Sequence, residues 1–297
     1  MALVRAAAAA PVEAGAAAAD PLREFAFSKG DFEFLAGLAY KHAGISLSDS
    51  KRNLVYSRLS RRLRALSLTS FAEYRQYLEG SGGDEIERFI NSISTNHTKF
   101  FREAHHFTHF RSTVQQTFAQ QDQKRVARRL RVWSAGCSTG EEPYTIALVL
   151  RREMPDMARH DVKILATDID TDVLAKASRG EYPADSLDNV PDPFVRYFQP
   201  VAESDGATIK VAHEVRALIT FRQLNLMSSW PMKGPFDAIF CRNVMIYFDA
   251  PTKSRLIDRF VHLIKPGGTL YIGHSESLLG AHAGLKLMGR TIYRRDA

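Results

Sequence analysis

The sequence has only two cysteines, Cys137 and Cys241, and no run of apolar residues long enough to cross a membrane. Two thiols exclude a disulfide framework and favour a reducing compartment. A membrane-spanning helix needs roughly 18 or more apolar residues in a row, so none is expected. We therefore expect a cytoplasmic protein of 297 residues, long enough for one large domain or two smaller ones.

The first twenty residues are rich in alanine but lack the leucine-rich core of a signal peptide. Pro11, Glu13 and Gly15 interrupt the alanines. Residues 1–20 are therefore interpreted as a disordered tail of low complexity, and an export signal is the less favoured alternative.

Residues 21–93 show helical periodicity and few signals of strands. In the first helix Phe34 and Leu38 fall on one face, and Gly44 ends the segment. Ser48 or Asp49 could cap the second helix. That helix places four apolar residues on one face: Val55, Leu59, Leu63 and Leu66.

The other side of the second helix is basic, although Arg52 does not fit this division. The cations that face away from the apolar side are Lys51, Arg58, Arg61, Arg62 and Arg64. Together with the net charge of +7, they indicate an acidic partner, whereas a merely solvated face is the alternative.

From about Arg131 strands and helices alternate, which predicts an α/β domain with a doubly wound, mostly parallel sheet. The expected strands are "RVWSA", "VKILATD", "FDAIFCRN" and "TLYIG". Residues 181–222 break this rhythm with short alternating runs, which predicts a small antiparallel insertion.

The first strand runs into the loop "AGCSTGEEPY", which should lie at the carboxyl edge of the sheet, where ligands bind. Gly136 and Gly140 allow a tight turn, but the loop lacks the Gly-Lys-Ser/Thr of an ATPase. Glu141 and Glu142 stand where a dinucleotide would place its pyrophosphate and would repel it. The loop therefore suits S-adenosylmethionine, which carries a sulfonium and an amino group and no phosphate.

The second strand ends at Asp168, whose carboxylate could accept hydrogen bonds from both hydroxyls of a ribose. The alternative is that Asp168 only caps the following helix.

Five segments, in this order, resemble the chemotaxis receptor methyltransferases, the CheR family: "NHTKFFREAHHF", "VWSAGCSTGEEPYTIAL", "ATDIDTDVLAKA", "FDAIFCRNVMIYF" and "LIKPGGTLYIGHSESL". The resemblance covers about residues 25–294. It implies an all-helical N-terminal domain at residues 21–93 and a class I methyltransferase domain at residues 94–297. It also implies a β-subdomain inserted at about residues 181–222.

The resemblance assigns S-adenosylmethionine as cofactor, with S-adenosylhomocysteine as product and no metal. It implies that Arg102 and Tyr247 serve catalysis. Glu142 is preferred to Glu141 as the acidic ligand, although the sequence does not decide between them. The implied cofactor-binding residues are Asn96, Thr98, Arg102, Gly136, Glu142, Asp168, Asn225, Leu226, Arg242 and Asn243.

The implied reaction is methyl transfer to glutamate side chains in the acidic, helical cytoplasmic region of chemoreceptors. We expect Arg58, Arg61, Arg62 and Arg64 to contribute to receptor docking. We also expect a monomer that neither inserts into a membrane nor binds nucleic acid. Whether the β-subdomain holds a tether peptide from a receptor C-terminus is left open by the sequence.

The segment "NHTKFFREAHHF" also allows a metal site, because His105 and His109 would share a helical face. No third ligand is near in the sequence, so a structural or solvated role for these histidines and His106 is preferred. Phe100 and Phe101 are expected to pack the join between the helical and catalytic domains, with the motif as a hinge.

Two further alternatives concern function. A nucleic-acid methyltransferase that acts on base amines often carries a proline pair after the fourth strand, where this chain reads "CRNVMIYF". A cofactor-binding regulator without catalysis is the other alternative, and the filled motif positions argue against it.

Overall fold

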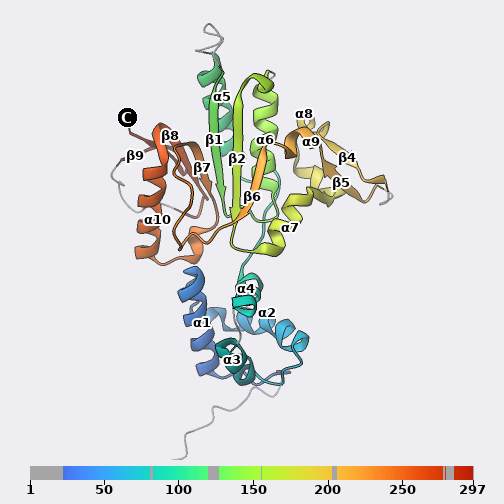
Figure 1. Cartoon of the computed structure of the whole chain (residues 1–297), viewed down its shortest axis with the longest axis vertical. Helices are drawn as coiled ribbons and strands as arrows, with labels where there is room; N and C mark the ends of the chain where they lie inside the picture. Colours follow the sequence, from blue (N-terminus) through green and yellow to red (C-terminus); the bar gives the residue numbers. More distant parts are fainter. Residues whose placement is uncertain are drawn as a thin grey trace, which may run out of the picture.

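The computed structural model describes residues 23–80, 83–119, 127–154, 156–202, 206–276, 278 and 284–296. The predicted Ala-rich tail, residues 1–20, lies outside these residues. Figure 1 shows a helical domain at one end of an α/β domain, with a small β-subdomain at the side of the latter. Within the described residues, no helix has both the length and the apolar character needed to cross a bilayer.

The helical domain contains α1 (Lys29–Ala43), α2 (Arg52–Ala65), α3 (Phe71–Gly80) and α4 (Gly83–Ile93). A capping box between Ser28 and Asp31 begins α1, and Gly44, at φ 70°, ends it as predicted. The buried face of α1 is centred on Phe32, Leu35 and Ala39. The predicted apolar face, with Phe34 and Leu38, is therefore not the buried face of the helix. Both of these side chains are only partly buried.

Helix α2 buries Val55, Leu59 and Leu63 as predicted. The predicted cap is not made, because a short 3-10 turn, Asp49–Lys51, precedes the helix and the Ser48 side chain makes no capping hydrogen bond. Arg52, which did not fit the basic side, donates to the carbonyl of Phe27 at 2.8 Å.

The main sheet has the strand order β6-β2-β1-β7-β8-β10-β9, and its first five strands are parallel, which confirms a mostly parallel sheet. The C-terminal hairpin β9–β10 is antiparallel and was not predicted. The strands are β1 (Arg129–Ala135), β2 (Asp161–Asp168), β6 (Ile219–Gln223), β7 (Phe236–Cys241), β8 (Ile264–Ile272), β9 (Leu285–Gly289) and β10 (Ile292–Arg295). The main helices of this domain are α5 (Ala104–Ala119), α6 (Glu141–Glu153), α7 (Thr171–Arg179) and α10 (Ala250–Leu263).

The insertion is a three-stranded antiparallel sheet with the order β3-β5-β4. Its elements are β3 (Glu181–Pro183), α8 (Asp192–Val195), β4 (Phe198–Pro200), β5 (Thr208–Val211) and α9 (His213–Arg216). Strand β6 pairs in parallel with β2, from Ile164↔Ile219 to Asp168↔Gln223. The insertion therefore ends before β6, and the predicted limit at residue 222 lies inside the main sheet.

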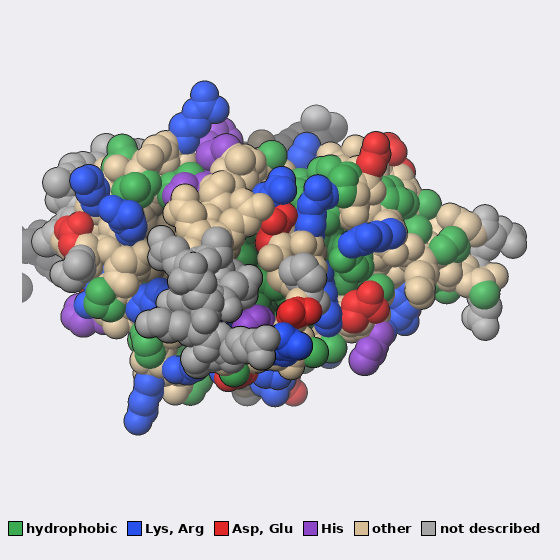
Figure 2. Space-filling view, turned by 90° about the horizontal axis from the view of Figure 1, so that it is seen from above, with side chains coloured by type: hydrophobic (Ala, Val, Ile, Leu, Met, Phe, Trp, Pro, Cys, Tyr) green, Lys and Arg blue, Asp and Glu red, His purple; other side chains and the backbone are tan. Residues whose placement is uncertain are grey.

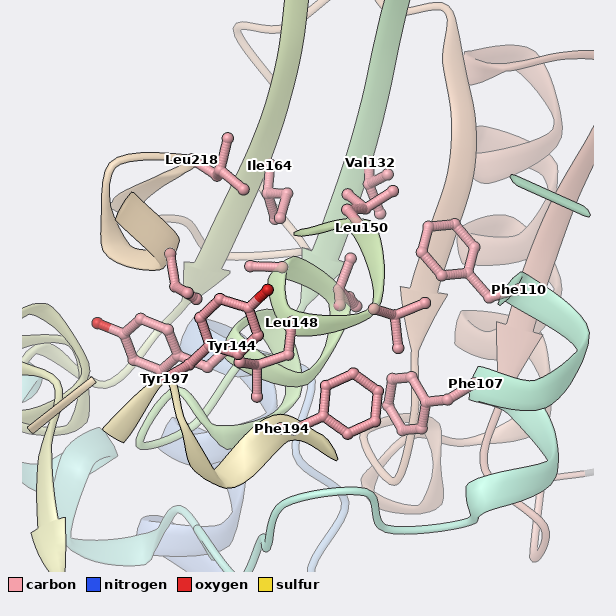
Figure 3. Packing of buried hydrophobic residues seen from close by; sticks show 14 of the residues in the cluster. Phe107, Phe110, Val132, Tyr144, Leu148, Leu150, Ile164, Phe194, Tyr197 and Leu218 are labelled. Carbon is pink, nitrogen blue, oxygen red and sulfur yellow. The ribbon is translucent and has the colours of Figure 1, made fainter. Parts of the chain in front are cut away.

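The largest core cluster joins α5, α6 and the sheet to the β-subdomain, as the side chains in Figure 3 show. Phe100 packs edge-on against Tyr182 and Phe198, and Phe101 packs against Phe194. The expectation that these two rings join the helical and catalytic domains is therefore wrong. They attach the β-subdomain to the catalytic core instead.

Candidate functional site

A cavity opens at the carboxyl ends of β1, β2 and β7. These strand ends face the helical domain (Figure 1). Its volume, with the open mouth included, is about 960 Å³. Ala43, Ile45 and the linker residues 93–98 form the wall contributed by the helical domain. Every residue predicted for catalysis or cofactor binding lines it: Asn96, Thr98, Arg102, Gly136, Glu142, Asp168, Asn225, Leu226, Arg242, Asn243 and Tyr247.

The loop after β1 depends on glycine for two reasons. Gly136 has a φ of 83°, and a Cβ there would lie 2.3 Å from Cγ2 of Val244 across the cavity floor. Gly140 has a φ of 100°, and a Cβ there would lie 2.9 Å from both the Ala177 Cβ and the Tyr182 hydroxyl. Side chains at these positions would push the loop away from the segment after β7, from α7 and from the β-subdomain.

Asp168 is buried at the end of β2, and its two carboxylate oxygens accept the backbone N–H groups of Ser138 at 2.8 Å and Asp170 at 3.0 Å. Burial raises the pKa of Asp168, while these N–H groups act in the opposite direction. The alternative that Asp168 caps α7 is wrong, because Asp170 is the residue that caps this helix. Asn96 donates to the other oxygen of Asp170 at 2.6 Å, which joins the linker to β2.

Arg242 lies in a buried chain of charges. Its Nη1 donates to Oε2 of Glu142 at 2.9 Å, and its Nη2 lies 3.3 Å from Oε2 of Glu103. Arg242 also donates to the carbonyl of Arg102. The guanidinium therefore holds the walls of the cavity in place, since only 2% of its side chain is exposed.

The structure favours Glu142 over Glu141 as the acidic group of the cavity. Glu142 accepts from the Ser134 hydroxyl at 2.7 Å as well as from Arg242, and it lines the cavity. Burial raises its pKa, and Arg242 opposes this shift. Glu141 accepts from Thr139 at 2.7 Å instead.

Sequence reasoning missed Glu103, which follows Arg102 in the motif and has a φ of 57°. Its carboxylate accepts from the backbone N–H of His274 at 3.3 Å and lies 3.1 Å from Nδ1 of His274. Burial works to raise the pKa of Glu103, but Arg242 and the His274 contacts outweigh it and hold the pKa low. The signal in the sequence was a charged residue within a motif otherwise assigned to the cofactor.

Three predicted residues anchor the helical domain to the cavity. Arg102 donates to the carbonyl of His97 at 2.7 Å, and the Tyr247 hydroxyl donates to the carbonyl of Thr95 at 3.4 Å. Asn225 donates to the carbonyl of His42 at 2.5 Å. Arg102 and Tyr247 thus lie against the same short linker, on one wall of the cavity.

The four arginines predicted to dock a receptor have different surroundings. Arg58 donates to the carbonyls of Ile93 at 2.6 Å and Ser94 at 2.9 Å, which ties α2 to the linker. Arg62 pairs with the buried Glu85 at 2.6 Å. Arg64 pairs with Glu24 at 2.5 Å on the surface, and Arg61 is exposed. The contacts of Arg58 and Arg62 give both of them a structural role that the sequence did not reveal.

The histidines of α5 face the C-terminal strands. His105 lies 3.2 Å from the carbonyl of Arg290, and His109 lies 3.0 Å from the Tyr271 hydroxyl. His106 is fully buried and lies 3.1 Å from the Thr291 hydroxyl. Across the described part of the chain there is no group of three or more residues that could hold a metal ion.

Comparisons with known proteins agree with this arrangement. A family model described as "CheR methyltransferase, SAM binding domain" matches residues 96–294, and "CheR methyltransferase, all-alpha domain" matches residues 30–94. "Chemotaxis protein methyltransferase 2" of Pseudomonas aeruginosa is 44% identical over 273 residues, which is 91% of this chain and 95% of that protein. "Chemotaxis protein methyltransferase" of Escherichia coli strain K12 is 43% identical over 271 residues, 90% of this chain and 91% of that protein.

Proposed function

The chain belongs to the CheR methyltransferase family, and we propose that it transfers a methyl group from S-adenosylmethionine to glutamate side chains of chemoreceptors. It is a methyltransferase that uses S-adenosylmethionine and acts in chemotaxis. We propose, beyond this activity, which residue accepts the methyl group, which region of the receptor binds and what single side chains do.

The observation that carries the proposal is one cavity that brings together the whole predicted set of cofactor residues with Arg102 and Tyr247. Its polar groups suit the cofactor. Glu142 and Asp168 place two carboxylates in the cavity beside the guanidiniums of Arg102 and Arg242. This mixed charge suits the sulfonium, amino and carboxylate groups of S-adenosylmethionine.

The chemistry asks for positioning rather than proton removal. A glutamate carboxylate is already ionised at neutral pH, because its ordinary pKa is about 4.3. S-adenosylmethionine, held by the cofactor-binding residues of the cavity, would supply the methyl group: the carboxylate oxygen would bond to the methyl carbon as the carbon–sulfur bond breaks, and the electron pair of that bond would stay on sulfur. Arg102 and Tyr247 would orient the incoming carboxylate, and the walls of the cavity would exclude water.

The exposed cations of the helical domain support an extended acidic partner. Arg61 and Arg64 lie on the exposed side of α2, so they would attract an acidic helix by charge. We propose that a monomer binds the receptor in this way. The β-subdomain presents two short edge strands, β3 and β4, where a tether peptide from a receptor would add as a further strand.

The test is methyl transfer from labelled S-adenosylmethionine onto chemoreceptors of the same cell, with the modified peptide identified by mass. The expected product is a glutamate methyl ester. Treatment with base should hydrolyse this ester to glutamate and release labelled methanol. Calorimetric binding of S-adenosylhomocysteine without transfer to any receptor would instead support a regulator. Label on nucleic acid, and none on receptors, would support a nucleic-acid methyltransferase.

A further inference from the structure

The segment between β7 and α10 presents several cavity residues on a turn with little regular structure. Asn243, Val244 and Tyr247 from this segment line the cavity. Asn243 has a φ of 60°, and a 3-10 turn, Met245–Tyr247, follows. Irregular backbone of this kind needs partners for its N–H groups when it is buried.

Glu276 supplies these partners from the loop after β8. Its carboxylate is 5% exposed and has no place in the proposed chemistry. Oε2 accepts the backbone N–H groups of Gly273 at 2.6 Å and Asn243 at 2.9 Å, while Oε1 accepts that of Ile246 at 3.1 Å. One carboxylate thus bonds both ends of the turn that leads to Tyr247.

Gly273 allows the two segments to meet. A Cβ at this position would lie 2.6 Å from Nδ2 of Asn243, 2.8 Å from its backbone nitrogen and 2.8 Å from Oε2 of Glu276. The loop after β8 can therefore pass the turn only without a side chain at this point.

We infer that Glu276 is a positioning residue, which fixes the turn from Asn243 to Ile246 and so sets the place of Tyr247 at the cavity. This inference rests on the proposed role of Tyr247 in methyl transfer. An ionised carboxylate is suited to the task because both of its oxygens only accept hydrogen bonds. A carboxamide of the same shape can accept with one oxygen only, and its NH₂ group would face an N–H donor.

The test is Glu276→Gln in the full chain. The amide oxygen should take the place of Oε2, where it keeps two hydrogen bonds, so the contact with Ile246 is the one that is lost. Amide hydrogen exchange at Ile246 should become at least tenfold faster, while Asn243 stays protected. Turnover of receptor should fall by about tenfold to a hundredfold, as expected for a misplaced group, and the affinity for S-adenosylhomocysteine should change less than twofold.

The matched control is Glu33→Gln, an equivalent change at an exposed residue of α1 that pairs with Lys29. It should leave exchange, turnover and affinity unchanged. Glu276→Asp is the second variant, because it keeps the charge but is one methylene too short to reach Ile246. In Glu276→Asp, as in Glu276→Gln, amide hydrogen exchange at Ile246 should become faster and turnover of receptor should fall.

Unchanged turnover in both Glu276 variants, or unchanged exchange at Ile246, would overturn the inference. An equal loss of turnover and affinity, with exposure of both amides, would reduce Glu276 to a residue of general stability and would also overturn it. If the unaltered protein methylates no receptor, the proposed function fails, whereas the exchange measurement still decides whether Glu276 holds the turn.

Discussion

Arg102 is a partly exposed cation that could either stabilise the fold or orient the reactants. Its guanidinium lines the cavity and donates a hydrogen bond of 2.7 Å to the carbonyl of His97, which lies only five residues earlier in the chain. A bond of this kind contributes about 0.5–1.5 kcal/mol to the free energy of unfolding. A group that orients two reactants is worth more to the rate, because a misplacement of about 1 Å can cost roughly a hundredfold.

We therefore expect Arg102→Ala to lower kcat by about a hundredfold and to change the midpoint of urea unfolding only slightly. Labelled methyl transfer and urea titration measure the two effects. Arg102→Lys, which keeps a charge but not the planar guanidinium, should retain part of the activity. Near-normal turnover of a folded Arg102→Ala would contradict the role.

His106 is a buried imidazole whose lowered pKa affects the stability of the fold. Burial first, and then the charges of Arg242 and His105, lower its pKa, although Glu103 acts in the opposite direction. The pKa of His109 is also lowered, by burial and by Arg294. Both imidazoles are therefore neutral in the folded chain at pH values where they are protonated in the unfolded chain.

The lowered pKa values of His106 and His109 make the free energy of unfolding depend on pH. Because the unfolded chain binds these protons first, the stabilisation is complete above the ordinary pKa of about 6.5 and is lost as pH falls below it. We expect the two histidines to lower the free energy of unfolding between pH 7 and pH 5, and comparison with a histidine variant separates their effect from that of buried carboxyls with a raised pKa, such as Glu142. Urea unfolding over this range should show a smaller slope for His106→Gln. A slope equal to that of the unaltered chain would contradict the assignment.

At the scale of elements, α2 tests the docking prediction. Arg64 pairs with Glu24, but both side chains are about half exposed, and exposed pairs contribute only about 0–1 kcal/mol. Arg64 can therefore exchange Glu24 for a receptor carboxylate at little cost, as can the exposed Arg61. Arg62 is held by a carboxylate whose side chain is only 5% exposed, so it should contribute less.

We expect Arg61→Glu combined with Arg64→Glu to raise KM for receptor severalfold at low ionic strength and much less at high ionic strength, because salt screens exposed charges. The control reverses Arg129 and Lys163, which are exposed near the amino ends of β1 and β2. Figure 2 shows that end of the molecule, where acidic and basic side chains are mixed. A KM that is unchanged at both salt concentrations would rule out docking through α2.

Elements were predictable where local periodicity agrees with the final packing. The strands β1, β2 and β7, the turn at Gly180 and the buried face of α2 have strong local patterns, and the structure contains them. Strand β6 was assigned to the insertion, because its short alternating run resembles an edge strand. Only its pairing with β2, some 55 residues earlier in the chain, reveals its place.

The site was predictable as a set of residues but not as a set of contacts. The motifs named the residues of the cavity, whereas the chain Glu142–Arg242–Glu103 joins positions 100 and 139 residues apart. Such pairs depend on where the strands end relative to one another. The roles of Arg58 and Glu276 were hidden for the same reason, since each acts on backbone groups of a distant segment.

At the scale of the whole molecule, the cavity exists only where the two domains meet. The wall from the helical domain contains Ala43 and Ile45, and the backbone N–H of Ser46 donates to the carbonyl of Tyr247 at 2.8 Å. Tyr40 adds a hydrogen bond to Asp249 at 2.8 Å. The helical domain should therefore affect cofactor binding as well as receptor docking.

Gly37 within α1 and Gly44 at its C-cap can test whether the helical domain affects cofactor binding. Gly44 has a φ of 70°, and a Cβ there would lie 2.7 Å from the Met227 sulfur in the other domain. Gly37 lies on an exposed part of α1, and a Cβ there would meet nothing within 4 Å. The two positions therefore differ in their contact with the catalytic domain and in their backbone conformation.

We expect Gly37→Ala to raise the free energy of unfolding by about 0.5–1 kcal/mol, because alanine favours the helix. Gly44→Ala should lower it by about 1–3 kcal/mol through its left-handed backbone. It should also weaken the binding of S-adenosylhomocysteine several-fold, because the clash with Met227 moves Ala43 and Ile45 away from the cavity. Urea unfolding and calorimetric titration of both variants measure these effects. Unchanged affinity in a folded Gly44→Ala would show that the cavity tolerates a shift between its two domains.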